Sequence, residues 1–208
     1  SAQYRREVEA GMERRKGVRI MPVACDRSQP RQYGDEQGRY WAVSQVIGVV
    51  TGEKGYGSEQ AMQRGSDVHN IFALAVGHHA GLCDPPDVPD EYAGYYRGIL
   101  AWIEKMNPRP SGLERTMRHK VYPYAGTADF IGMIDEEFGV LDLKTGAPEK
   151  WHRLQLHAYQ KMLDKAAKMW VLYVADDGVF KQVPIKPSAR DWAAFQNGLS
   201  ILQWREGA

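Results

Sequence analysis

The 208-residue chain has few cysteines, no long apolar run and almost no net charge. Cys25 and Cys83 cannot supply the four thiolates of an iron–sulfur cluster, and two free, reduced thiols fit a cytoplasmic setting. No stretch is apolar enough for a membrane span, and we expect neither a membrane partner nor a signal peptide. The formal net charge of +1 does not by itself indicate a nucleic-acid binder, although positive charge can be concentrated locally.

The length favours one domain with a full hydrophobic core, spanning residues 1–208. We expect residues 1–43 to form an N-terminal basic arm and loop, and residues 44–208 to form the folded core. The arm either lies along a phosphate backbone or is the solvated face of a terminal helix. Its basic residues are Arg5, Arg6, Arg14, Arg15, Lys16 and Arg19.

The segment 113–144 has the pattern of three strands. After a predicted turn at 107–112, the segment 113–122 reads as a strand. Ala125–Ile134 is rich in apolar and β-branched residues, Asp135–Gly139 has turn chemistry, and Val140–Lys144 resumes the strand pattern.

Two aspartates and a lysine mark the second and third of these strands. Because side chains alternate along a strand, Asp142 and Lys144 point to one face and Leu143 points to the core. If the strands pair, Asp129 and Asp142 converge with Lys144 beside them. Paired carboxylates suit Mg²⁺ or Mn²⁺, and an adjacent ammonium group stabilises developing negative charge. An ordinary Asp–Lys surface pair on a hairpin is the alternative.

Two predicted helices flank the strands in sequence. In the helix from Ser58 to about residue 78, His69 lies beside the apolar stripe, and a glycine one turn earlier removes bulk near the neighbouring backbone. In the helix from about residue 149 to 165, Gln155 and Tyr159 are four positions apart and share a face. Taken alone, a histidine on an apolar helix is more often a core residue than a ligand, and the Gln155–Tyr159 pair is typical of an ordinary amphipathic helix.

The order of these motifs resembles the PD-(D/E)XK nuclease superfamily, in its RecB-like branch of lambda-exonuclease-type, single-domain DNA exonucleases. The matching segments are Gly65–His69, Gly126–Asp129, Asp142–Lys144 and Gln155–Tyr159. Ala128 stands where the superfamily name has a proline. The resemblance implies an α/β fold, with a restriction-endonuclease-like core whose central mixed β-sheet is flanked by α-helices.

The resemblance also implies the roles of the site residues. Lys144 would position the attacking water, and Gln155 and Tyr159 would support the catalytic strand. Glu114 is either a further carboxylate of the site or a surface salt-bridge partner. The implied ligands of Mg²⁺ or Mn²⁺ are His69, Asp129, Asp142 and the main-chain carbonyl of Leu143. The residues expected to contact nucleic acid are Arg115, Arg118, Lys150 and Arg153.

The implied activity is metal-dependent hydrolysis of DNA phosphodiesters, from the ends of linear single- or double-stranded DNA. A nucleic-acid-binding subunit that keeps the fold but has weak catalysis, and a structure-specific endonuclease, are the alternatives. A homo-oligomer or a recombination partner protein is left open. A role in DNA recombination, repair or replication, in a bacterial or phage-infected cell, is an association from the family.

Overall fold

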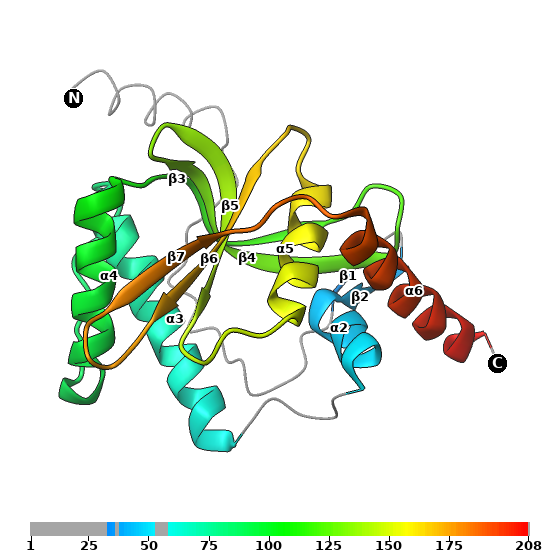
Figure 1. The fold of residues 1–208 in the computed structure, drawn as a ribbon, viewed down its shortest axis with the longest axis horizontal. Coiled ribbons are helices and arrows are strands. Elements are labelled where there is room, and N and C mark those ends of the chain that lie inside the picture. The colour runs from blue at the N-terminus through cyan, green and yellow to red at the C-terminus, as the bar shows by residue number, and fades with distance from the viewer. Residues whose placement is uncertain (1–32, 36–37, 53–57, 208) are drawn as a thin grey trace.

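A computed structural model describes residues 33–35, 38–52 and 58–207 of the chain, so the predicted basic arm lies outside the described residues. The described part contains a seven-stranded mixed sheet in the order β1-β2-β4-β5-β6-β7, with β3 paired to β4 (Figure 1). The strands are β1 (Tyr33–Asp35), β2 (Gly38–Ala42), β3 (Arg109–Arg118), β4 (Tyr124–Ile134), β5 (Glu137–Lys144), β6 (Lys168–Val174) and β7 (Phe180–Pro184).

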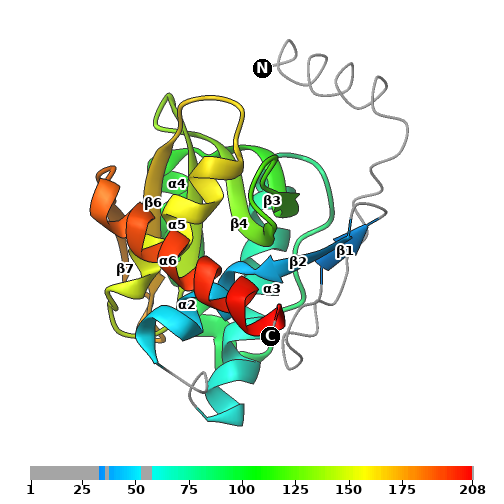
Figure 2. The same ribbon diagram turned by 90° about the vertical axis from the view of Figure 1, so that its right-hand side faces the viewer.

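Helices cover both faces of this sheet, as the sequence predicted. Helices α3 and α4 pack on one face, and α2, α5 and α6 pack on the other (Figures 1 and 2). Their bounds are α2 (Val43–Thr51), α3 (Glu59–His79), α4 (Ala93–Met106), α5 (Trp151–Met162) and α6 (Ala189–Glu206), and a 3-10 turn, η1 (Asp90–Tyr92), precedes α4. The α/β class with a central mixed sheet is confirmed, and the architecture is consistent with a restriction-endonuclease-like core.

The two cores follow from the alternation of side chains along β5. Val140 packs with the core under α2, α5 and α6, whereas Leu141 and Leu143 pack with the core under α3 and α4. The inward direction predicted for Leu143 is therefore confirmed. Among the residues that the structure describes, no helix combines the length and apolarity that crossing a membrane requires.

The β4–β5 hairpin exists as predicted, but its turn is shorter. Asp135 and Glu136 have φ angles of 48° and 62°, the left-handed values of a two-residue hairpin turn. Strand β5 therefore begins at Glu137 rather than at residue 140. Strand β3 likewise begins at Arg109, within the segment predicted to be a turn, because its first residues pair with the end of β4.

The pairing between strands β4 and β5 stops next to the two aspartates, Asp129 and Asp142. Their antiparallel pairing runs as far as Phe130 opposite Leu141 and then stops. Continuing that register by one step would place Asp129 opposite Asp142. Beyond this point β5 continues along β6, while the first half of β4 pairs with β3 and, at its start, with β2. The break leaves room for polar side chains between the strands, at the place where the sequence puts its carboxylates.

Helix α5 approaches β4 closely at Gly126. A Cβ atom at Gly126 would lie 2.7 Å from Cε1 of Tyr159 and 2.9 Å from Cγ2 of Val43. The glycine of the Gly126–Asp129 motif therefore makes space for the tyrosine of the α5 motif. Gly65 has no such role, contrary to our expectation, because a Cβ there would meet no described atom within 4 Å.

We expect Gly126→Ala to lower the free energy of unfolding by about 1–3 kcal/mol, because the added methyl group overpacks the contact with the Tyr159 ring. Gly65→Ala is the matched control: it adds the same group to open space inside helix α3 and should raise stability by about 0.5–1 kcal/mol. Urea unfolding of both variants measures the difference. Equal stabilities for the two would contradict the close approach at Gly126.

Candidate active site

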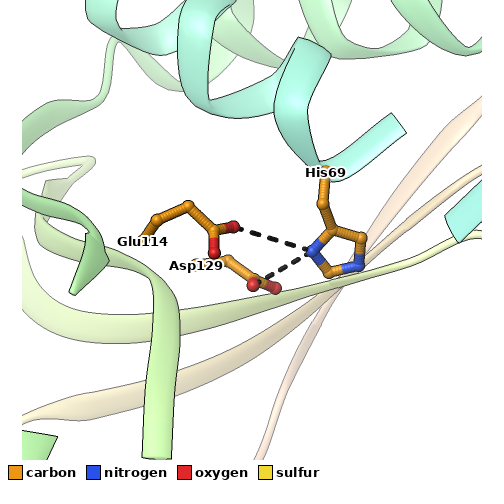
Figure 3. A group of neighbouring side chains, drawn as sticks. All are labelled: His69, Glu114 and Asp129. Carbon is orange, nitrogen blue, oxygen red and sulfur yellow. Dashed lines mark ion pairs between the residues drawn. The ribbon is translucent and has the colours of Figure 1, made fainter. Parts of the chain in front are cut away.

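Three potential metal ligands meet between α3 and the sheet. His69 comes from α3, Glu114 from β3 and Asp129 from β4 (Figure 3). Nδ1 of His69 lies 3.0 Å from Oδ1 of Asp129 and 4.0 Å from Oε1 of Glu114. One ligand atom from each residue lies within 4.8 Å of those of the other two. We call this group the His69–Glu114–Asp129 cluster.

The cluster brings two carboxylates together with little exposure to water, an arrangement that favours binding of a cation. The side chains of His69 and Asp129 are only 8% and 2% exposed, and that of Glu114 is 21% exposed. Two carboxylates this close repel each other unless a positive charge compensates them. Two carboxylate oxygens and one imidazole nitrogen within this span suit a shared divalent ion, since carboxylates favour Mg²⁺ and Mn²⁺. The donor set therefore fits the ion that the sequence implied.

Glu114 reaches the cluster from an unusual backbone conformation. Its φ angle is 44°, which few residues other than glycine adopt, although Leu113 and Arg115 on either side keep their pairing with β4. Such a conformation costs about 1–3 kcal/mol and persists only where the surroundings enforce it. The strain occurs at the one residue of β3 that contributes a carboxylate to the cluster, so it accompanies a potential functional role.

We expect Glu114→Gly to raise the free energy of unfolding by about 1 kcal/mol in EDTA, because glycine accepts a positive φ without strain. The same change should weaken Mn²⁺ binding, measured by calorimetric titration. Glu136→Gly is the matched control: Glu136 also has a positive φ, but it lies in the β4–β5 turn and is 79% exposed. It should raise stability without affecting Mn²⁺. A loss of stability in Glu114→Gly alone would contradict the assignment of strain.

A second group of polar residues runs from β5 to α5. Nζ of Lys144 lies 2.5 Å from Oδ2 of Asp142 and donates to Oε1 of Gln155 at 3.0 Å. Nε2 of Gln155 donates in turn to the hydroxyl of Tyr159 at 2.9 Å. The side chains of Asp142 and Lys144 are 1% and 15% exposed, so this is a largely buried ion pair. We call this group the Asp142–Lys144–Gln155–Tyr159 chain.

Both aspartates lie close to the end of this chain. Burial raises the pKa of Tyr159 well above its ordinary value, and the negative charges of Asp142 and Asp129 raise it further. The phenol is therefore neutral at physiological pH and carries its proton. The charges of Asp129 and Asp142, one from each group of residues, therefore act on the same hydroxyl.

A hydrogen bond to the backbone joins the two groups. Oδ2 of Asp129 accepts the N–H of Leu143 at 2.7 Å, across the gap where the β4–β5 pairing stops. Asp129 therefore contacts His69 through one oxygen and β5 through the other. Asp142 is not part of the His69–Glu114–Asp129 cluster and pairs with Lys144 instead. The ligand roles predicted for Asp142 and for the Leu143 carbonyl stay predictions.

The four basic residues expected to contact nucleic acid differ in their surroundings. Arg153 donates to Oδ2 of Asp191 on α6 from both Nε and Nη2, each at 2.8 Å. Arg118 donates to the Tyr40 hydroxyl at 2.6 Å. All four residues are exposed, including Arg115 and Lys150. Their proposed contacts with phosphate stay predictions.

The sequence interpretation missed several residues beside the site. The Tyr33 hydroxyl lies 3.1 Å from Oγ1 of Thr127, two positions before Asp129, so the β1–β2 hairpin reaches the site region from a segment that we expected to be a loop. The indole of Trp151 lies beside Lys144, whose Nζ is 5.1 Å from the ring centroid. Burial, and then the charge of Lys144, lower the pKa of His152 to about 3, so this imidazole is neutral. None of these contacts follows from spacing along a single strand or helix, so the sequence offered no signal for them.

Comparisons with known proteins leave the family of this chain unassigned. The sequence matches no protein-family model and no curated protein. The fold is similar to that of an alkaline exonuclease (LHK-Exo) from Laribacter hongkongensis, with a TM-score of 0.47 and 11% identity over 80% of this chain and 87% of that one. The complex of LHK-Exo with dAMP gives a TM-score of 0.38 and 12% identity over the same shares.

A third solved structure, that of SSO0001, gives a TM-score of 0.39 and 15% identity over 82% of this chain and 78% of that one. At these identities and TM-scores the likeness concerns the arrangement of helices and strands. It does not identify a substrate or any site residue of this chain.

Proposed function

We propose that this chain is a divalent-metal-dependent deoxyribonuclease that hydrolyses phosphodiester bonds, starting from DNA ends. One observation carries the proposal: a largely buried cluster with metal-ligand chemistry adjoins a largely buried lysine held in place by an aspartate and a glutamine. The Asp129–Leu143 hydrogen bond fixes the two groups relative to each other. Phosphodiester hydrolysis needs this combination, because the attack on phosphate builds up negative charge beside an activated water.

The His69–Glu114–Asp129 cluster would hold Mg²⁺ or Mn²⁺, with Asp142 and the Leu143 carbonyl as further ligands from β5. Such an ion, when bound, acidifies a water and neutralises charge on the phosphate. An imidazole ligand favours Mn²⁺ over Mg²⁺.

Lys144 would orient the attacking water or stabilise the negative charge that develops on the phosphate. Its ammonium group is held by Asp142 on one side and Gln155 on the other, so it needs little reorganisation during the reaction. Tyr159 holds the Gln155 amide through its hydroxyl and thus acts as a positioning residue. Four exposed basic residues would contact the DNA backbone: Arg115, Arg118, Lys150 and Arg153.

Incubation of the purified protein with linear and closed circular DNA, in Mg²⁺, Mn²⁺ or EDTA, tests the proposal. We expect linear DNA to be degraded in either metal, circular DNA to persist, and EDTA to stop the reaction. Nicking of circles would favour a structure-specific endonuclease. Retention of DNA without cleavage in either metal would favour a catalytically weak binding subunit, and cleavage in EDTA would overturn the metal requirement. A role in recombination, repair or replication is part of the same proposal.

A further inference from the structure

A small pocket lies beside Lys144, on the face of the sheet that α2 and α5 cover. Its volume is about 150 Å³. Its lining residues are Ser44 and Ile47 from α2, Lys144 from β5, and Trp151 and Gln155 from α5. Ile47 is buried and Trp151 is half-buried, so the aliphatic and indole side chains make walls that are mostly apolar.

The position of the pocket couples it to the proposed reaction. Two of its five lining residues, Lys144 and Gln155, belong to the Asp142–Lys144–Gln155–Tyr159 chain. The indole of Trp151 extends that wall, since Nζ of Lys144 lies 5.1 Å from the ring centroid. A group bound in the pocket therefore lies next to Lys144, the residue that we place beside the scissile phosphate.

The chemistry of the walls disfavours an anion. The only cationic group among the lining residues is Lys144, and its charge is already paired with the buried carboxylate of Asp142. A phosphate inside the pocket would have to leave water for walls that offer no cation other than Lys144, whose ammonium group we place beside the scissile phosphate. A flat group with apolar faces and a polar edge suits the pocket better.

We propose that the pocket receives the base of the nucleotide next to the scissile phosphate, an inference that rests on the proposed function. The indole of Trp151 and the side chain of Ile47 would contact the faces of the base, as aromatic side chains do in single-strand binding. The Gln155 amide has a second N–H besides the one given to Tyr159, and this donor can meet the edge of a base. A volume of about 150 Å³ is small beside the several hundred of drug-sized pockets, so one base fills it.

Stacking on an aromatic ring tolerates every base, because each has a π-face. The pocket would therefore hold the end of the strand in register without selecting a sequence. It would also require the nucleotide next to the cleavage position to leave its base pair.

DNA oligonucleotides with one abasic site, moved one nucleotide at a time through the cleavage position, test this inference. In Mn²⁺ we expect the wild-type enzyme to slow at one register only, by about 5- to 150-fold, the range that base stacking on an aromatic side chain provides. The same oligonucleotides in Ca²⁺, followed by fluorescence anisotropy, should bind more weakly by a comparable factor. In Trp151→Ala, intact and abasic DNA should be cleaved at nearly equal rates and bound with nearly equal affinities. The reason is that the aromatic ring on which the base would stack is removed.

Three further variants separate the pocket from general damage. Trp151→Phe should keep the abasic effect, and Ile47→Trp, which fills the pocket, should lose it. Trp204→Ala removes an indole that is 73% exposed on α6 and should behave as wild type. Equal rates and affinities for intact and abasic DNA in the wild type, or an undiminished abasic effect in Trp151→Ala, would overturn the inference. DNA binding that depends on the base without cleavage in any metal would overturn the proposed function and leave the pocket supported.

Discussion

Replacing Lys144 with methionine is expected to abolish DNA cleavage and to destabilise the fold. The cleavage rate should fall by at least about 100- to 1000-fold, because a preorganised group that stabilises developing charge is removed. The free energy of unfolding should fall by about 3 kcal/mol, because the carboxylate of Asp142, which is 1% exposed, loses the ammonium group that compensates it. Single-turnover cleavage and urea unfolding in EDTA measure the two effects.

The two effects can be separated with a second change. In the double variant Asp142→Asn with Lys144→Met, no buried charge is left without a partner, so most of the lost stability should return while cleavage stays absent. A double variant that is stable and active would remove Lys144 from the chemistry.

Lys168→Met provides the matched control on the neighbouring strand. Lys168 of β6 pairs with Glu137 of β5 at 3.0 Å, and both side chains are more than half exposed. Removal of an exposed pair of this kind should change stability by less than about 1 kcal/mol and leave cleavage unchanged. The contrast between the two lysines isolates the effect of burial and of position beside the site.

The sequence was sufficient for the parts of the site that depend on local periodicity. Alternation along one strand places Asp142 and Lys144 together, and a spacing of four along one helix places Gln155 and Tyr159 together. Both pairs lie as predicted, and they meet through the Lys144–Gln155 hydrogen bond. The mixed sheet with helices on both faces was implied by the resemblance to a known family, and not by these local patterns.

The remaining parts depend on contacts between distant segments or on backbone conformations that the residue type disfavours. Strand β2 pairs with β4 at Trp41 and Tyr124, more than eighty positions apart, so its membership of the sheet left no local signal. The sequence left open whether Glu114 belongs to the site or forms a salt bridge on the surface. Glu114 reaches the cluster through a positive φ, which glutamate rarely adopts and which its residue type does not predict. Arg153 lies opposite Asp191 of α6 because two helices pack together, and no spacing within α5 could indicate that partner.

Asp129 is the residue whose replacement should distinguish the metal site from the scaffold. Its two oxygens have different partners: Oδ1 lies beside His69, and Oδ2 accepts the Leu143 N–H. In Asp129→Asn the side-chain oxygen can still accept that N–H, while the negative charge is lost. In Asp129→Ala the N–H loses its acceptor in a buried place, which costs about 1–3 kcal/mol.

We therefore expect both variants to lose cleavage and Mn²⁺ binding, and only Asp129→Ala to be strongly destabilised in EDTA. Thermal unfolding with and without Mn²⁺ is the measurement that separates these effects. A ligand that binds only the folded state stabilises it by about 2.7 kcal/mol at a hundred times its Kd, so the wild-type midpoint should rise with Mn²⁺ and those of both variants should not.

Asp164→Asn is the control, because Asp164 is a 76% exposed partner of Lys120 and should leave the Mn²⁺ response unchanged. If Asp129→Asn kept the full rise in midpoint, the ion would bind elsewhere, and the His69–Glu114–Asp129 cluster would be a buried ion pair with a structural role. If Asp129→Asn lost the rise while Glu114→Gly kept it, the ion would be held from β4, β5 and α3 alone. The Mn²⁺ responses of Asp129→Asn and Glu114→Gly thus show which strands supply the ligand carboxylates. They also show whether a cation binds where the β4–β5 pairing stops.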